Sequence, residues 1–265
     1  RTNNFENKMN IAKLIIFSFI LLSFSTSGIS REIGETEITT DDGIEVFQNE
    51  KYYLLKKNVK ITSDDFEITS DRVKANFEID LYDITSLETK GSSTLNAIKY
   101  GVTGEGDEIN INIKSEVIIV RGKDSFLNLQ ETKMSSDGSI KVNNSLGTFE
   151  LRGVNSNLQN DELDIYGEYI SGVFAEFDGK KQIKKLNVED ENLLTINTEN
   201  LEMNAKKAVY DDQTNIIELF SKVKIVKGQE IITGDYGYFD TIKNSYKVKS
   251  DNTSKVKVTI KNSNE

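Results

Sequence analysis

Apolar and polar residues alternate along most of the chain after its first 30 residues. The clearest runs are Ile109–Ile113, with the sequence Ile-Asn-Ile-Asn-Ile, and Val256–Ile260, with the sequence Val-Lys-Val-Thr-Ile. A period of two places alternate side chains on a buried face and in water, which is typical of half-buried β-strands. The pattern therefore predicts an all-β protein.

Short turn sequences separate the alternating runs. They are Asp41-Asp42-Gly43, Asp64-Asp65, Asp137-Gly138, Asp178-Gly179, Asp211-Asp212 and Lys227-Gly228. Strands and turns repeating every 8–12 residues or so predict a sandwich, a barrel or a roll. Residues 200–209 give the one weak sign of a helix.

One sequence element recurs along the chain. Ile68-Thr69-Ser70-Asp71 returns as Ile232-Thr233-Gly234-Asp235 and, in a looser form, as Ile165-Tyr166-Gly167-Glu168. The lead-ins Asn58–Ile61 and Lys222–Ile225 also match, and twelve residues separate the valine of each from its acid. Each copy reads as a strand-turn-strand rung that needs neighbouring rungs to bury its apolar face. We place the repeats at about residues 50–90, 150–190 and 194–250.

Residues 1–30 have the order of a secretory signal peptide. Met9 is read as the true start, with residues 1–8 lying upstream of it. Lys13 supplies the positive charge, and Leu14–Phe24 is an apolar run followed by small residues. Cleavage would leave residues 31–265 as a single exported roll. Two alternatives are an uncleaved membrane anchor, which needs about 20 apolar residues, and a buried core helix.

Composition narrows the chemistry. The chain has 265 residues and a net charge of −10, with no His, Cys, Trp or Pro. Without cysteine there is no disulfide and no thiolate nucleophile, and without histidine the commonest general base and metal ligand are missing. The charges form no basic stripe, which argues against nucleic acid as a partner.

The acidic residues are best explained as turn-formers. Adjacent carboxylates such as Asp64 and Asp65 are usually solvated in β-turns, whereas a catalytic pair must face across a cleft. The acidic segment Gly104–Glu108 lacks the complete pattern of a calcium loop. The repeated acids Asp71, Glu168 and Asp235 are expected to anchor strand ends. We predict no enzyme activity, no metal and no cofactor.

The repeats resemble the OstA-like domain of the lipopolysaccharide-transport (Lpt) proteins, and most closely the LptA-like periplasmic bridge. The similar segments are Asn58–Asp71, Tyr166–Tyr169, Ala175–Asp178, Ala208–Asp211, Ile217–Ile225, Ile232–Tyr236, Tyr238–Asp240 and Tyr246–Val248. Ser221 stands where that family usually has glycine. The similarity covers residues 50–90 and 150–250, while residues 92–150 match only loosely.

This resemblance implies a twisted β-jelly-roll, open at both ends, that binds lipopolysaccharide through its lipid A acyl chains. The inward side chains of the rungs are then the candidate lipid-binding residues: Val59, Ile61, Phe66, Ile68, Val73, Leu163, Ile165, Val223, Ile225, Ile232 and Tyr236. Any one of them could equally be plain core. The implied function is a non-enzymatic periplasmic bridge from the inner to the outer membrane.

The resemblance also implies contacts through edge strands. Residues 37–46 and Lys255–Ile260 are the expected edges, where a roll can add a strand from inner- and outer-membrane Lpt components or from a second copy, head to tail. The lysines near the C-terminal edge could instead protect it from aggregation. An LptC-like membrane-anchored component and a surface structural or adhesive roll are the alternative functions.

Overall fold

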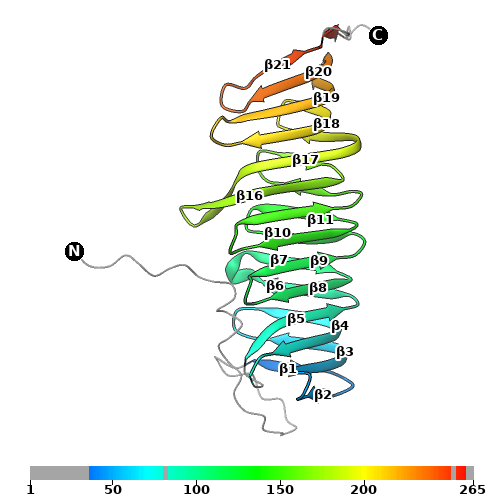
Figure 1. Cartoon of the computed structure of the whole chain (residues 1–265), viewed down its shortest axis with the longest axis vertical. Helices are drawn as coiled ribbons and strands as arrows, with labels where there is room; N and C mark the ends of the chain where they lie inside the picture. Colours follow the sequence, from blue (N-terminus) through cyan, green and yellow to red (C-terminus); the bar gives the residue numbers. More distant parts are fainter. Residues whose placement is uncertain (1–35, 80–82, 252–254, 261–265) are drawn as a thin grey trace, which may run out of the picture. The chain divides into compact units, whose positions relative to one another are not determined.

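The computed structural model describes residues 36–79, 83–251 and 255–260, which are almost entirely β-strand (Figure 1). The predicted signal peptide or anchor lies outside these residues. In chain order the strands up to residue 121 are β1 (Glu37–Thr39), β2 (Ile44–Phe47), β3 (Tyr52–Thr62), β4 (Glu67–Phe77), β5 (Ile84–Lys90), β6 (Ser93–Ala97), β7 (Val102–Gly106), β8 (Glu108–Asn112) and β9 (Val117–Arg121). A short 3₁₀ turn, Ile98–Tyr100, precedes β7.

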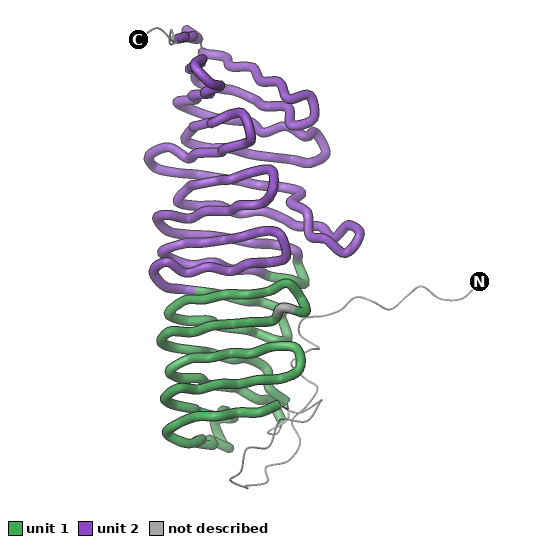
Figure 2. Tube along the Cα trace, turned by 180° about the vertical axis from the view of Figure 1, so that it is seen from behind, with its two compact units in different colours: residues 1–120, 143–146 green, residues 121–142, 147–265 purple. Residues whose placement is uncertain are grey.

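The later strands are β10 (Ser125–Leu129), β11 (Thr132–Ser136), β12 (Ser139–Asn143), β13 (Thr148–Arg152), β14 (Asn157–Gln159), β15 (Asp164–Tyr166), β16 (Tyr169–Phe177), β17 (Lys180–Asn197), β18 (Glu202–Asp211), β19 (Ile216–Lys227), β20 (Glu230–Asp240), β21 (Ser245–Lys249) and β22 (Lys257–Ile260). The chain divides into two compact units (Figure 2). Unit 1 comprises residues 1–120 and 143–146, and unit 2 comprises residues 121–142 and 147–265.

The long strands of each unit bend at a corner. In unit 1, β3 and β4 pair with a break in register between Lys56 and Val59, where Lys57 and Asn58 have φ values of 62° and 49°. In unit 2, β19 has the same break at Ser221 and Lys222, with φ values of 63° and 55°. Extra residues with left-handed backbone bend a strand sharply and let it pass from one sheet to another.

Because of these corners, each unit has two half-sheets whose buried faces meet. In unit 2, half-sheet I contains β10, β11, β14, β15 and the end of β17, residues 194–197. Half-sheet II contains β13, β16 and the start of β17, residues 180–189. The all-β roll of stacked rungs that the sequence predicts is therefore confirmed.

The loosely matching stretch between residues 92 and 150 also forms rungs. In unit 1, β6 pairs with β4, and β8 pairs with β5. In unit 2, β11 pairs with β14, and β13 pairs with β16. The stretch belongs to the roll rather than forming an insertion into it.

The weak helix expected at residues 200–209 is wrong. Residues 202–209 belong to β18, which pairs with β17 and with β19. Ala205 and Ala208 of this segment are buried on the inner face. Ladder hydrogen bonds on both sides of the strand override the helix propensity of alanine.

Candidate functional site

The candidate lipid-binding residues of unit 1 lie together on the inner face. Val59, Ile61, Phe66, Ile68 and Val73 are all buried. Ile61 and Ile68 are direct partners across β3 and β4, and Val73 pairs with Leu55 on the far side of the corner. The set therefore spans both half-sheets of the unit.

The candidates of unit 2 divide into two groups. Ile165, Val223 and Ile225 are buried. Leu163 and Ile232 are partly exposed, although Ile232 is the direct partner of Ile225 on the same face. Leu163 precedes β15, in the turn where its carbonyl accepts a hydrogen bond of 2.9 Å from the amide of Asn160.

Tyr236 does not belong to the inner set, so its predicted inward placement is wrong. It pairs with Phe220, while the next pair, Leu219 and Gly237, occupies the buried face. Its ring packs edge-on against Phe220 at 5.4 Å, and its hydroxyl donates a hydrogen bond of 2.5 Å to Oε1 of Glu218. Burial and this carboxylate raise the pKa of Tyr236 to about 12.

The corner explains the error. On β4 the buried face carries Ile68 and Ser70 before the corner and Val73 after it. The corresponding residue of β20 after its corner is Gly237, so Tyr236 corresponds to the exposed Arg72. At the bend two residues instead of one separate consecutive inward positions. The inward residues therefore change from even to odd numbers, which simple alternation does not reveal.

The repeated acids lie at the corners, where several receive hydrogen bonds from the adjacent rung. The amide of Asp251 donates to Oδ2 of Asp235 at 3.1 Å, and the amide of Glu191 donates to Oε2 of Glu168 at 3.4 Å. A Cβ at Gly91 would lie 2.3 Å from Oδ2 of Asp71, which shows how closely this carboxylate covers the next corner. These contacts agree with an anchoring role.

Asp137 is a corner acid that the repeat search missed. Its carboxylate accepts hydrogen bonds from the amide of Asp124 at 2.9 Å and from Nδ2 of Asn155 at 2.6 Å. These donors lower the pKa of Asp137, with the backbone amide contributing most. The pair Ser136-Asp137 repeats Ser70-Asp71, a signal that was present in the sequence.

Buried hydroxyls line the inside of the corners. In unit 1, Ser70 lies 3.0 Å from Ser93, whose Oγ accepts a hydrogen bond of 2.6 Å from Thr89. In unit 2, Ser136 lies 2.9 Å from Ser156. Each hydroxyl has a partner, as buried polar groups require. The inner face is thus apolar along its strands and polar at the corners.

The terminal strands carry the inner face to the edges. In unit 1, β2 places Val46 opposite Tyr53, yet Val46 is 45% exposed. In unit 2, β22 places Val258 opposite Ile232, and Val258 is 53% exposed. Both strands pair with an inner neighbour, β3 and β20 respectively, as expected for edges. Each unit therefore presents apolar inner-face residues at an exposed terminal strand.

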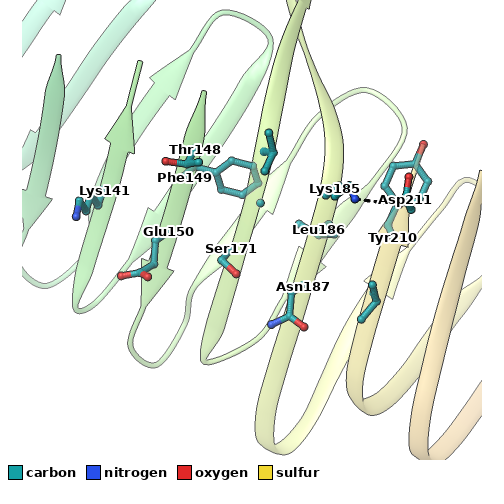
Figure 3. Close-up of a pocket in the computed structure, with 13 residues that line it drawn as sticks. Lys141, Thr148, Phe149, Glu150, Ser171, Lys185, Leu186, Asn187, Tyr210 and Asp211 are labelled. Atoms are coloured by element: carbon teal, nitrogen blue, oxygen red, sulfur yellow. Dashed lines mark ion pairs between the residues drawn. The ribbon is translucent and has the colours of Figure 1, made fainter. Parts of the chain in front are cut away.

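A groove of about 500 Å³ crosses unit 2 (Figure 3). Its lining comes from Lys141, Thr148–Glu150, Ser171–Val173, Lys185–Asn187 and Val209–Asp211. Gly172 is one of these lining residues, and a Cβ there would lie 2.4 Å from the ring of Phe149 and 2.4 Å from the carbonyl of Lys185.

The carboxylates of this groove are already engaged by cations. Lys185 pairs with Asp211 at 3.3 Å, and Arg152 pairs with Glu150 at 2.7 Å. The guanidinium of Arg152 lowers the pKa of Glu150 below its ordinary value. Paired charges on a sheet surface are structural, so we assign no chemistry to the groove.

Comparison with known families decides the identity of the fold. Residues 37–244 match the family described as "LptA/(LptD N-terminal domain) LPS transport protein". The chain belongs to this family. The match includes residues 92–150, and it confirms the OstA-like resemblance found in the repeats.

Among solved structures, this Lpt chain matches LptH from Pseudomonas aeruginosa, described as the LptA homologous periplasmic component of the lipopolysaccharide transport device. The identity is 12%, and the match covers 62% of this chain and 97% of that one, with a TM-score of 0.27. At that score the superposition adds no argument to the family assignment. The curated proteins give no match.

The described part of the Lpt chain offers no metal centre. Among residues 36–79, 83–251 and 255–260, no three His, Cys, Asp or Glu side chains gather where they could hold an ion. The same residues include no helix with the length and hydropathy of a membrane span.

Proposed function

We propose that this Lpt chain is a non-enzymatic periplasmic bridge that carries lipopolysaccharide along the inner face of its half-sheets. The observation that supports it most is the apolar inner face of each unit, which reaches an exposed terminal strand at Val46 in unit 1 and at Val258 in unit 2. A closed sandwich would cover such residues at its ends.

The energetics suit a passage for acyl chains. Removing a methylene from water yields about 0.8 kcal/mol, so a single acyl chain gains several kcal/mol without any polar contact. The side chains expected to touch it are the buried candidates, such as Ile68 in unit 1 and Ile165 and Ile225 in unit 2. These residues now pack in the core, so an acyl chain would replace contacts between the half-sheets.

Partners would join at the terminal strands. β2 and β22 can each accept a further strand, which supplies backbone hydrogen bonds and continues the apolar face. We assign inner- and outer-membrane Lpt components to these edges, with a head-to-tail copy of the chain as a further occupant.

An LptC-like, membrane-anchored component is the second candidate, favoured by the apolar stretch Ile11–Ile29. The two differ at the N-terminus of the mature protein. N-terminal sequencing of chain recovered from membranes would start at Met9 for the anchored form and near residue 31 for the exported one.

Photo-crosslinking in cells tests the transport proposal. A photoreactive residue at Ile225 or Ile232 on the inner face should yield a lipopolysaccharide adduct. The same residue at Tyr236, on the outer face of β20, is the matched control and should yield none. The absence of an adduct at both inner positions, with the protein folded, would contradict the proposal and favour a structural β-roll.

A further inference from the structure

The hairpin formed by β16 and β17 grows out of unit 2 (Figures 1 and 2). The strands pair regularly up to Val173 and Lys185, then shift register at Phe174, leaving Lys184 as an extra residue. Beyond this bulge the hairpin continues to a tight turn at Asp178 and Gly179, with φ values of 50° and 76°. A bulge bends a hairpin and re-aims its tip.

The tip contacts a turn that is distant in the sequence. Nε2 of Gln130 donates to the carbonyl of Gly179 at 3.1 Å, and Oε1 of Gln130 accepts from the amide of Lys181 at 2.8 Å. Beside it, Nζ of Lys180 lies 2.7 Å from Oε1 of Glu131. One glutamine amide thus holds the hairpin backbone through both its donor and its acceptor.

The two contacting elements belong to opposite half-sheets. Gln130 and Glu131 join β10 to β11 in half-sheet I, whereas the hairpin extends half-sheet II. The half-sheets of unit 2 are joined at the corners, such as the break between Glu189 and Leu194 in β17. Turns at the far ends of the strands therefore form two free margins, and the hairpin links one margin to the other.

We propose that this hairpin is a strap that closes the side of the inner face in unit 2, with Gln130 as its latch. The proposal rests on the lipid-carrying function proposed above. With the strap closed, an acyl chain on the inner face cannot leave sideways at this rung and must move along the rungs.

The strap is built to open. Residues 175–180 are exposed, including Phe177 at 61%, so no buried contact holds the tip. The Lys180–Glu131 pair is 65% and 59% exposed, and salt weakens such pairs. Segments with few buried contacts open at low cost, whereas Phe174 at the base stays buried against Phe149, with ring centroids 4.5 Å apart.

Release of lipid A with a fluorescent acyl chain into excess phosphatidylcholine vesicles tests the strap. The release variant is Gln130→Asn with Lys180→Gln, because asparagine tolerates the φ of 54° at this position but reaches less far. The closing variant is Glu131→Cys with Lys180→Cys, joined through their thiols, since the natural chain has no cysteine. The control Lys243→Gln removes an ion pair within one turn, between the exposed Lys243 and Asp240.

We expect lipid A release to be about tenfold faster from the release variant and unchanged in the control. Release from the closing variant should be slower while the cross-link is intact and should return to the natural rate after reduction. Equal rates before and after reduction, in protein that loads normally, would overturn the strap and leave the transport proposal standing. Failure of the natural chain to load lipid A would overturn both. Should the release variant fail to fold, the release rates of the closing variant before and after reduction test the strap by themselves.

Discussion

Nδ2 of Asn155 donates a hydrogen bond of 2.6 Å to Oδ2 of Asp137, which ties together two successive corners of unit 2. The amide of Asp124, on the preceding corner, donates to the other oxygen of the same carboxylate at 2.9 Å. One side chain therefore connects three bends of the chain. This contact holds the rungs in register along the side where the half-sheets join.

Replacing Asp137 with alanine should lower the midpoint of thermal unfolding by a few degrees, because both donors lose their acceptor. Glu199→Ala, at an exposed turn of the same unit, is the control and should change little. Because the folded-state pKa of Asp137 is lowered, its contribution is present above its ordinary value of 3.8 and is lost as pH falls through the folded value. An unchanged midpoint at neutral pH would contradict this role.

Gly172→Ala should destabilise the protein by about 1–3 kcal/mol, since the new methyl would clash with the Lys185 carbonyl and the Phe149 ring. Gly237→Ala is the matched control. Its nearest neighbour is a methyl group of Val223 at 3.0 Å, which can shift, so a smaller cost is expected. Denaturant unfolding of both variants gives the comparison, and equal costs would show that the backbone yields at Gly172.

Tyr236 should make the protein sensitive to alkali. Burial, then the hydrogen bond to Glu218, raise its pKa from 10.0 to about 12. A raised folded-state pKa means that the contribution is complete below pH 10 and is lost as the pH rises towards 12. Tyr236→Phe cannot ionise and should flatten the stability profile in that window, as measured by denaturant titrations at several pH values. A profile identical to that of the natural chain would exclude this contribution.

Val46→Lys should weaken end-to-end association. The charge would lie on the inner-face side of edge strand β2, where a joining strand would have to bury it. Analytical ultracentrifugation at rising concentration should show fewer multimers than for the natural chain. Ile79→Lys, at an exposed turn of unit 1, controls for charge alone. An equal loss of multimers in both variants would mean that the edge strand is not the interface.

Much of the fold follows from local signals. Alternation at Ile109–Ile113 and Val256–Ile260 correctly indicated strands, because successive side chains of a strand point to opposite faces of the sheet. The turn Asp178-Gly179 is an Asp-Gly pair with positive φ at both residues, the preferred chemistry of a two-residue hairpin. The equal spacing in the repeats reflects a structural unit that the copies share, a pair of strands bent at a corner.

Other features depend on distant residues and were out of reach. The inward placement of Tyr236 failed because a corner shifts the alternation by one residue, and the alternation itself does not reveal the shift. The latch at Gln130 joins residues about 50 positions apart, which no periodicity connects. By contrast, Gly106-Asp107 and Ser136-Asp137 repeat the small-then-acid signal and could have identified rungs within residues 92–150.

The corners also govern how a chain of this kind can change in length. Adding or deleting a complete rung leaves every corner carboxylate opposite the bend that it holds, and the inward side chains stay inward. A change of one residue within a strand would instead turn apolar side chains towards solvent through the rest of that strand. Such a protein should therefore evolve by gaining or losing whole rungs. Insertions of an odd number of residues should be confined to the turns along the free margins, where the strap formed by β16 and β17 lies.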